Sequence, residues 1–226
     1  MKSTYEGDKT DGIRTYRVRG KRMTGPQERA LERHWDTFGI EPSEKPLNFP
    51  EIFPECNAFV FEIGFGMGEA TWQIAQAFPE TGFIAIDVHR PGIGRLLIEI
   101  VANNISNVRT MFGDAHLIFD AMVPDQSLDG IHLFFPDPWP KVRQHKRRIV
   151  NEEFIAMAHR ALKPGGYIHI ATDWQNYAEW IVEKFAASPL FSGGEVDRPG
   201  WRPLTKFEGQ GLRKGHVISD LRYIKI

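Results

Sequence analysis

A glycine-rich segment at 62–69 combines residue types that can bind a small ligand. Glu62 is followed by Gly64, Gly66 and Gly68, between an apolar run and a helix-like stretch. Glycines there let the chain turn tightly and let a ligand approach the backbone. A dinucleotide fingerprint needs Gly or Ala at position 69, where this chain has Glu, whose charge repels a pyrophosphate. The pattern favours a ligand without phosphate over an NAD-dependent oxidoreductase, although alone it also fits an ordinary strand–helix loop.

Two aspartates come at the ends of the next apolar runs. Asp87 closes the run at 83–88, where an acidic side chain can accept hydrogen bonds from both hydroxyls of a ribose. Asp114 follows the run at 108–112, where a carboxylate can accept from the exocyclic amine of an adenine. Either aspartate alone could simply cap a helix. Together with the glycine segment they predict a site for S-adenosylmethionine, whose amino and sulfonium groups are cationic.

A proline-flanked aspartate follows the fourth apolar run. Asp137 lies between Pro136 and Pro138, and Trp139 comes next. The prolines stiffen the backbone and so aim the side chain. A rigid Asp beside a Trp suits a flat, hydrogen-bonding substrate such as a nucleobase. The alternatives are an Asp that only caps its own turn and a Trp that packs in the core.

Positive charge is concentrated directly after that turn. Positions 141–148 hold five Lys or Arg residues and one His, in a chain whose 28 basic and 29 acidic residues give a net charge of -1. A charge run is often only a solvated surface. Because this one adjoins the predicted site, it favours contact with nucleic-acid phosphates. The basic segment at 1–22 adds a second patch.

The apolar runs alternate with helix-like stretches, which indicates how these side chains are positioned. Strand-like runs lie at 58–63, 83–88, 108–112, 130–135, 167–172 and 217–226; helix-like stretches lie at 26–38, 69–78, 92–103, 115–122, 151–162 and 174–187. The alternation predicts a doubly wound, mostly parallel α/β sheet. The carboxyl ends of its strands meet at one edge, where such sheets bind ligands. The Lys-Pro-Gly-Gly segment at 163–166 predicts a sharp break between a helix and a strand.

Composition narrows the class of protein. Hydrophobic residues make up 42% of the 226 residues and charged ones 25%, as in soluble globular proteins. The single cysteine, Cys56, excludes an intrachain disulfide and a multi-cysteine zinc site, so we expect no metal and a reducing cytoplasm. With no apolar leader and no long apolar window, we expect no secretion signal and no membrane contact. We expect residues 1–55 to form a basic arm with a leading helix, and residues 56–226 to form the ligand-binding domain.

Six motifs together resemble the bacterial tRNA (guanine-N7-)-methyltransferases. They are FEIGFGMG at 61–68, IDVH at 86–89, GDA at 113–115, LFFPDPWPKVRQHKRRIV at 133–150, ATDW at 171–174 and TKFE at 205–208. The resemblance extends from about Arg17 to the C-terminus, and the segment at 133–150 is its most specific part. It implies a Rossmann-like, seven-stranded methyltransferase sheet with S-adenosylmethionine as cofactor. It also implies methyl transfer to N7 of the guanine at tRNA position 46, by a cytoplasmic monomer or homodimer.

The resemblance further implies a role for each matched residue. Asp137 is the catalytic residue, and the cofactor contacts are Glu62, Gly64, Gly66, Gly68, Asp87, Asp114 and Asp137. The substrate contacts are Lys141, Asp173, Thr205, Lys206, Phe207 and Glu208. The RNA contacts are Arg143, Gln144, His145, Lys146, Arg147 and Arg148.

Methylation of guanine N7 requires no general base before attack, because N7 offers a lone pair and carries no proton. Alignment and anions near the developing purine cation should provide the catalysis. Asp137 fits that role, with Asp173 and Glu208 as acceptors for the guanine N1 and N2 hydrogens. Two rivals stay open: a methyltransferase acting on another RNA, a small molecule or a protein, and an RNA-binding module that kept the fold and lost the chemistry.

Overall fold

An eight-stranded sheet organises residues 14–16 and 22–226, which are the residues that this computed structural model describes. The strands lie in the order β1–β4–β3–β2–β5–β6–β8–β7. Their bounds are β1 Gly39–Ile40, β2 Ala58–Ile63, β3 Thr81–Asp87, β4 Val108–Phe112, β5 Leu128–Phe134, β6 Leu162–Thr172, β7 Phe191–Val196 and β8 Ser219–Lys225. Strands β1 to β6 pair in parallel, and β8 pairs antiparallel with both β6 and β7.

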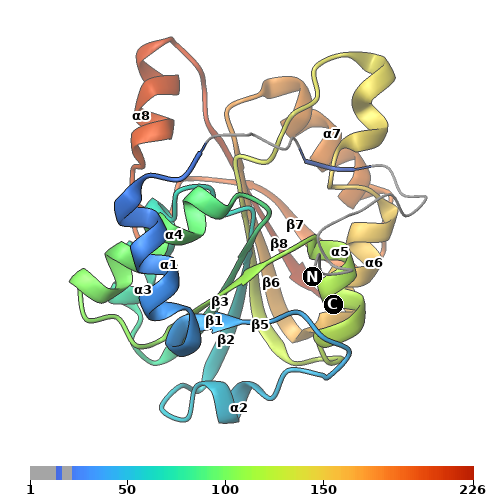
Figure 1. Cartoon of the computed structure of the whole chain (residues 1–226). Helices are drawn as coiled ribbons and strands as arrows, with labels where there is room; N and C mark the ends of the chain where they lie inside the picture. The colour runs from blue at the N-terminus through green and yellow to red at the C-terminus, as the bar shows by residue number, and fades with distance from the viewer. Residues whose placement is uncertain (1–13, 17–21) are drawn as a thin grey trace.

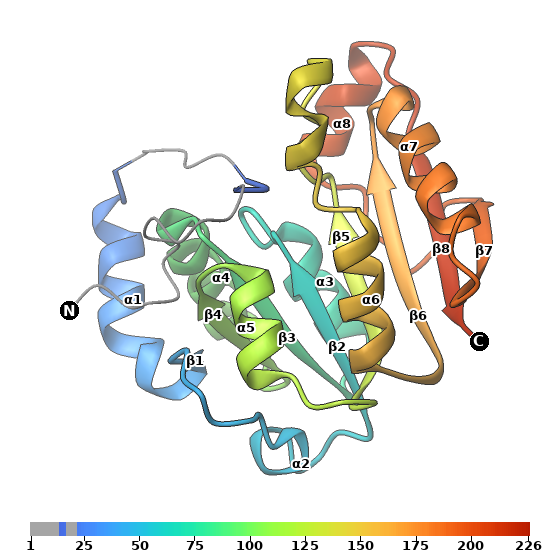
Figure 2. The same ribbon diagram turned by 90° about the vertical axis from the view of Figure 1, so that its right-hand side faces the viewer.

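Helices cover both faces of the sheet, as Figures 1 and 2 show from two directions. Helices α1, α3 and α4 lie on one face, and α5, α6 and α7 lie on the other. The helices are α1 Gly25–Phe38, α2 Phe49–Ile52, α3 Glu69–Ala77, α4 Arg90–Ala102, α5 Ala115–Met122, α6 Glu152–Ala161, α7 Gln175–Ala186 and α8 Lys206–Arg213, with the 3-10 helix η2 at Val142–Arg147. Within the described ranges, no helix is both long and apolar enough to cross a bilayer.

Burial of the sheet on both faces explains the continuous apolar runs. Phe61, Ile84, Val108 and Ile131 in the central strands are fully buried, because each faces a layer of helices. The structure confirms the predicted doubly wound, mostly parallel α/β fold, with eight strands in place of the expected seven. The apolar runs did not mark β1, which has only two residues, or β7, whose sequence FSGGEV is mostly exposed.

A reversal of chain direction across the sheet creates the place for a ligand. From β2 the chain moves outward to β3 and then β4, and it returns to β5 on the other side of β2. Open α/β sheets bind ligands at such a switch point, beyond the carboxyl ends of the strands. The glycine segment follows β2 and the proline-flanked turn follows β5, so the two come from the neighbouring strands at this switch point.

The Lys-Pro-Gly-Gly segment does not separate a helix from a strand as expected. Strand β6 begins at Leu162, and its pairing with β5 shifts register between Leu162 and Tyr167. Gly165 has a φ of 76°, so the four residues form an irregularity inside the strand.

The described part of residues 1–55 is integrated into the fold. Ala30 and Trp35 of α1 pack against the α4 layer, and Phe49 and Phe53 join the core on the other face. Most of the predicted basic arm, residues 1–13 and 17–21, lies outside the described residues.

Candidate active site

Three left-handed glycines shape the loop after β2. Gly64, Gly66 and Gly68 have φ values of 73°, 63° and 74°, which side chains with a Cβ rarely adopt. A Cβ at Gly64 or Gly66 would meet nothing within 4 Å, so this side of the loop is open. A Cβ at Gly92 would lie 1.8 Å from the Gly66 oxygen, so α4 begins in direct contact with the loop. The backbone is therefore exposed to a ligand on one side and supported on the other.

Asp87 ties the end of β3 to the glycine loop. Its Oδ2 accepts a hydrogen bond from the Gly66 N–H at 2.7 Å, and its Oδ1 accepts from the His89 N–H at 2.9 Å. Both carboxylate oxygens of Asp87 therefore accept from backbone N–H groups at the start of the loop and of α4. The short side chain thus orders the glycine loop at the carboxyl edge of the sheet.

Glu62 is a buried carboxylate at the carboxyl end of β2. Its side chain is 2% exposed, and Oε2 has no hydrogen-bond partner among the described residues. Burial raises the pKa of the Glu62 carboxyl to about 7; the Thr71 hydroxyl opposes that shift and the Asp87 carboxylate adds to it. An unsatisfied buried acid of this kind is stabilised by a cation that reaches it.

Asp114 begins α5 and contacts the N-terminal part of the chain. Its Oδ1 accepts from the His116 N–H at 2.9 Å, which makes it the helix N-cap. Burial raises the pKa of the Tyr16 hydroxyl, and the Asp114 carboxylate raises it further through its charge and a hydrogen bond. Residues 14–16 therefore reach the end of β4, a contact that the sequence patterns did not indicate.

The turn after β5 has an uncommon backbone. Phe135 and Trp139 both have positive φ, 53° and 45°, on either side of Asp137. The Phe135 N–H donates to the Ala171 oxygen at 2.7 Å, which ties the turn to β6. Residues other than glycine in the left-handed region of φ and ψ cost free energy, and they are concentrated at functional sites. Asp137 itself is half-buried, and its charge contributes to the raised pKa of Tyr177, whose main cause is burial.

Trp139 is a core residue in this structure. Its side chain is 4% exposed, and its Nε1 donates to the Thr15 oxygen at 2.9 Å. The Arg147 guanidinium lies over the indole at 5.0 Å from the ring centroid. Of the two alternatives that the sequence leaves open, packing in the core is therefore the one observed, and a stacked base has no access to this ring.

The basic run divides into an exposed face and a buried anchor. Lys141, Arg143 and Lys146 are exposed, as the surface for an RNA backbone requires. The expectation that Arg148 contacts RNA is wrong, because its side chain is 1% exposed. Its guanidinium donates to the Pro138 oxygen at 3.0 Å and to Asn176 Oδ1 at 2.7 Å, and it lies over the rings of Tyr177 and Trp180.

Gln144, His145 and Arg147 are half-buried within η2 and its surroundings. The His145 ring packs edge-on against Trp180 at 5.7 Å between centroids. These three residues lie between the exposed face and the core, so only part of each side chain is available to RNA.

The TKFE segment folds back to the sheet edge that carries the glycine loop. Thr205 caps α8 by accepting from the Glu208 N–H at 3.2 Å, and the Lys206 N–H donates to Glu69 Oε2 at 2.7 Å. Phe207 is half-exposed and meets the Phe135 ring at 5.3 Å. Figures 1 and 2 both show α8 beyond the same end of the sheet as the segment after β5. The return of this segment, expected from the sequence, is present.

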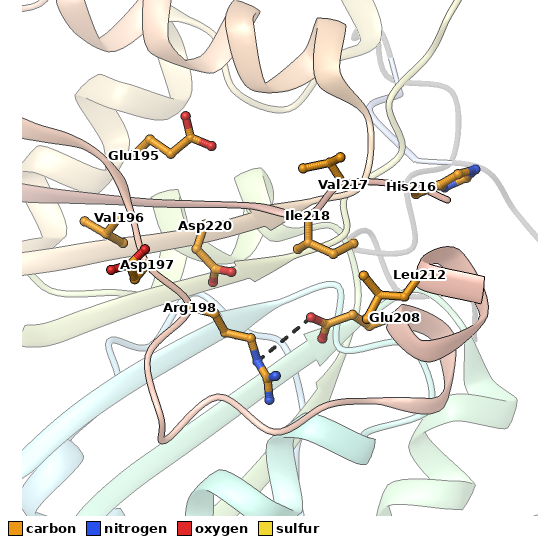
Figure 3. A pocket seen from close by; sticks show the side chains of 10 residues that line it. All are labelled: Glu195, Val196, Asp197, Arg198, Glu208, Leu212, His216, Val217, Ile218 and Asp220. Atoms are coloured by element: carbon orange, nitrogen blue, oxygen red, sulfur yellow. Dashed lines mark ion pairs between the residues drawn. The ribbon is translucent and has the colours of Figure 1, made fainter. Parts of the chain in front are cut away.

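Glu208 does not lie open to a substrate, which corrects the expectation that it accepts directly from a base. Its side chain is 1% exposed and accepts from both terminal nitrogens of Arg202 at 2.6 and 2.9 Å. Glu208 lines an open hollow of about 1060 Å³ between α8 and the β7–β8 strands. Figure 3 shows the Arg198 side chain directed toward the Glu208 carboxylate. Neither Asp137 nor Asp173 lines this hollow.

Asp173 lies at the carboxyl end of β6 and is partly exposed. Its Oδ2 lies 2.9 Å from Nδ1 of His216, which is three residues beyond the end of α8. Lys141, the N-cap of η2, is exposed.

A buried ionic network supports the tail and was not predicted. Arg202 also donates to both Asp220 oxygens at 2.7 and 2.8 Å, and His169 Nε2 lies 2.8 Å from Asp220 Oδ1. All of these side chains are at most 2% exposed. The available signal was polar residues inside apolar strands: His169 in β6 and Asp220 in β8 interrupt the runs that identified those strands.

Comparison with known proteins gives relatives over nearly the whole chain. Residues 57–221 match a family described as "Putative methyltransferase". The tRNA (guanine-N(7)-)-methyltransferase of Streptomyces avermitilis is 45% identical over 219 residues, covering 95% of this chain and 76% of the relative. The enzyme of the same name from Neisseria meningitidis serogroup B is 46% identical over 217 residues, covering 95% and 91%.

Solved structures share the fold at low sequence identity. The 16S rRNA methyltransferase KamB is 13% identical with a TM-score of 0.58, covering 78% of this chain and 92% of that one. A Streptococcus mutans protein solved in complex with SAH is 12% identical with a TM-score of 0.52, covering 78% and 94%. These likenesses support the methyltransferase architecture, whereas the sequence relatives identify the group. The chain belongs to the family of tRNA (guanine-N(7)-)-methyltransferases.

Proposed function

We propose that this protein transfers the methyl group of S-adenosylmethionine to N7 of a guanine in tRNA, at position 46 by resemblance. The observation that carries the proposal is the meeting of two sets of residues at one sheet edge. Glu62, Asp87 and Asp114 lie at the ends of β2, β3 and β4, while Asp137 and Asp173 follow β5 and β6. The first set suits an adenosyl cofactor, and the second suits a nucleobase beside it.

The residues present fit the cofactor. The orphaned Oε2 of Glu62 is buried and suits the ammonium of the methionine part. The open side of Gly64 and Gly66 leaves the room that a Cβ would fill, and Gly68 completes the same loop. We assign Asp87 to the ribose hydroxyls and Asp114 to the adenine amine. When bound, the cofactor supplies an electrophilic methyl group on a sulfonium.

Catalysis in this proposal depends on alignment and charge. Guanine N7 carries no proton, so no side chain has to remove one before attack. The methyl group brings positive charge onto the purine, and the Asp137 carboxylate stabilises that charge from the turn after β5. The two flanking prolines and the bond from Phe135 to Ala171 hold this turn in place before substrate arrives.

The substrate side of the site is assembled from separate elements. Asp173 accepts hydrogen bonds from the guanine edge, Lys141 holds a phosphate or the base carbonyl, and α8 covers the base with Thr205, Lys206 and Phe207. Glu208 acts through Arg202, since its carboxylate is occupied there. The exposed Arg143 and Lys146, with Gln144, His145 and Arg147 beside them, contact the RNA backbone.

The arm and the domain have separate parts in this proposal. Residues 1–55 contribute an RNA-binding arm and a leading helix, and residues 56–226 contain both binding sites. The protein acts on tRNA in the cytoplasm as a monomer or homodimer.

One experiment tests the function. The protein is incubated with methyl-labelled S-adenosylmethionine and unmodified tRNA, and the product is digested to nucleosides. We expect label in N7-methylguanosine, and loss of that label when the guanine at position 46 is replaced by adenine. Label in another nucleoside, or in ribosomal RNA or a small molecule only, would favour the alternative of a methyltransferase with a different substrate.

A further inference from the structure

His216 and Asp173 form a pair between segments that are distant in the sequence. His216 Nδ1 lies 2.9 Å from Asp173 Oδ2, and the side chains are 39% and 21% exposed. A carboxylate only accepts, so Nδ1 carries the proton of this bond. No other hydrogen bond to the Asp173 carboxylate is made within the described part of the chain. The second oxygen, Oδ1, is therefore left for a ligand.

The end of α8 is built to hold His216 in this place. Gly215 is left-handed with a φ of 79°, the His216 N–H donates to the Gly211 oxygen at 3.1 Å, and the Gly215 N–H donates to the Leu212 oxygen at 2.9 Å. These two bonds make a complete Schellman motif, which fixes the direction in which the chain leaves a helix. His216 is the residue immediately after the left-handed glycine, so its position is set by the helix end.

The absence of a side chain at Gly211 leaves room for the contact between Asp173 and His216. Gly211 is buried in α8, and a Cβ there would lie 3.4 Å from Asp173 Oδ2 and 3.7 Å from His216 Nδ1. A longer side chain would grow into the pair. Helix α8 is therefore tied to the carboxyl edge of the sheet at both ends, by the Lys206 N–H on Glu69 at its start and by His216 on Asp173 beyond its end.

We propose that His216 is a positioning residue for guanine recognition. It holds Asp173 in one orientation through Oδ2, so that Oδ1 faces the base, and it closes α8 over the site once the helix end has formed. This inference rests on the proposed function, because Asp173 is there a contact to the guanine. It assigns a role to a residue outside all the motifs by which the sequence resembles its family.

Three substitutions at His216 separate this role from general support of the fold. His216→Asn keeps an N–H donor at the place of Nδ1, whereas His216→Gln puts its donor at the place of Nε2 and His216→Ala removes it. We expect Ala and Gln to lower kcat/KM for tRNA about 10-fold or more, the loss typical of a hydrogen bond to a charged group. We expect Asn to stay within about 3-fold of the wild type, and all three to keep the cofactor Kd and the Tm.

Coupling to Asp173 provides the second readout. Asp173→Asn should lower kcat/KM by itself, and adding His216→Ala to it should have little further effect, because the two residues act as a unit. His159→Asn is the matched control, since His159 lies in the last turn of α6 just before β6 begins, at the other edge of the sheet. It should leave kcat/KM unchanged.

The outcomes are distinguishable. A wild-type protein that does not methylate tRNA overturns the proposed function. A wild type that does so, with His216→Ala at full kcat/KM, overturns this inference alone. So does a set of variants in which Asn is as impaired as Ala, or in which Tm and cofactor affinity fall together with kcat/KM.

Discussion

At the scale of single residues, Glu62 stands out because it is a buried acid whose Oε2 has no hydrogen-bond partner among the described residues. Such a group costs stability in the free protein and gains from a bound cation. The pKa of the Glu62 carboxyl is raised because the side chain is buried at the end of β2, away from water. The residue is thus suited to bind a charged ligand.

Cofactor affinity should fall as the pH is lowered through about 7, the pKa of Glu62 in the free protein. A proton on the carboxyl competes with the ammonium of the cofactor, so binding at about pH 6 should release close to one proton, and binding at about pH 8 fewer. Calorimetry in two buffers with different ionisation enthalpies measures this number.

The control is Glu62→Gln, which should bind more weakly at all pH values and show no proton release from this site. The stability of the cofactor-free wild type should also fall as the pH rises from the usual Glu range to about 7. The sign follows because the folded protein binds the proton of Glu62 more tightly than the unfolded chain does. The contribution of Glu62 to the free energy of unfolding is therefore complete below the unfolded pKa, and it is lost as the pH rises through the folded pKa of about 7. An affinity independent of pH in the wild type would contradict the assignment.

Asp137→Asn should lower the rate of methyl transfer at saturating cofactor by about 100-fold or more. The variant keeps the shape of the side chain and removes the charge that stabilises the purine cation. Single-turnover kinetics with saturating tRNA measure the effect. A solvent isotope effect on the wild-type transfer step would speak against it, since N7 has no proton to give up.

At the scale of elements, η2 and its flanks combine two tasks in eight residues. The exposed Lys141, Arg143 and Lys146 face solvent, whereas Arg148 fastens the segment to α7 through Asn176 and Tyr177. The orientation of the exposed basic face thus depends on the buried guanidinium of Arg148.

Substitution should separate the two tasks. Arg143→Ala with Lys146→Ala should weaken tRNA binding and reduce the slope of log K against log salt by up to about 1.5, with stability unchanged. Arg148→Met should instead lower the free energy of unfolding by about 2–4 kcal/mol, because it leaves buried acceptors without a donor. Filter binding at several salt concentrations and thermal unfolding measure the two effects. A change in salt slope for Arg148→Met without loss of stability would return it to the RNA-binding face.

The sequence predicts the positions of the helices and strands better than it predicts which charged side chains are exposed. The runs at 58–63 and 108–112 match β2 and β4 residue for residue, because strands buried on both faces leave a continuous apolar pattern. Glu208 and Arg148 were expected to be contacts, but each is buried against a partner that lies several residues away or on another element. A charge in the sequence looks the same whether it faces solvent or a buried partner, so only the fold separates the two cases.

The whole molecule is held together at its antiparallel edge by a buried ionic network. Arg202 joins Glu208 of α8 to Asp220 of β8, and Asp220 reaches His169 of β6. The network adds buried charge to the apolar contacts that Leu221 and Tyr223 of β8 make with the core. Breaking one partner of such a group leaves uncompensated buried charges.

Arg202→Met should lower the free energy of unfolding by about 3–5 kcal/mol, because Glu208 and Asp220 both lose their counter-ion. For a chain of this size the Tm should fall by roughly 10 °C. The matched control is Arg198→Met on the same loop, whose side chain is 42% exposed and lies 3.9 Å from Glu208. It should cost about 1 kcal/mol or less. Calorimetry measures the unfolding of both variants. Equal losses in the free energy of unfolding would show that the buried ion pairs of Arg202 contribute no more than the exposed Arg198.

The strand order has a consequence for how the protein folds during its synthesis on the ribosome. Strand β8 lies between β6 and β7, although the ribosome makes it after β7. While β8 is still inside the exit tunnel, β7 has no strand to pair with and α8 has no Asp220 behind Arg202. Strand β7 and the buried ionic network can therefore be completed only after residues 219–225 have left the ribosome, so the segment that carries Glu208 is among the last parts of the domain to be fixed in place.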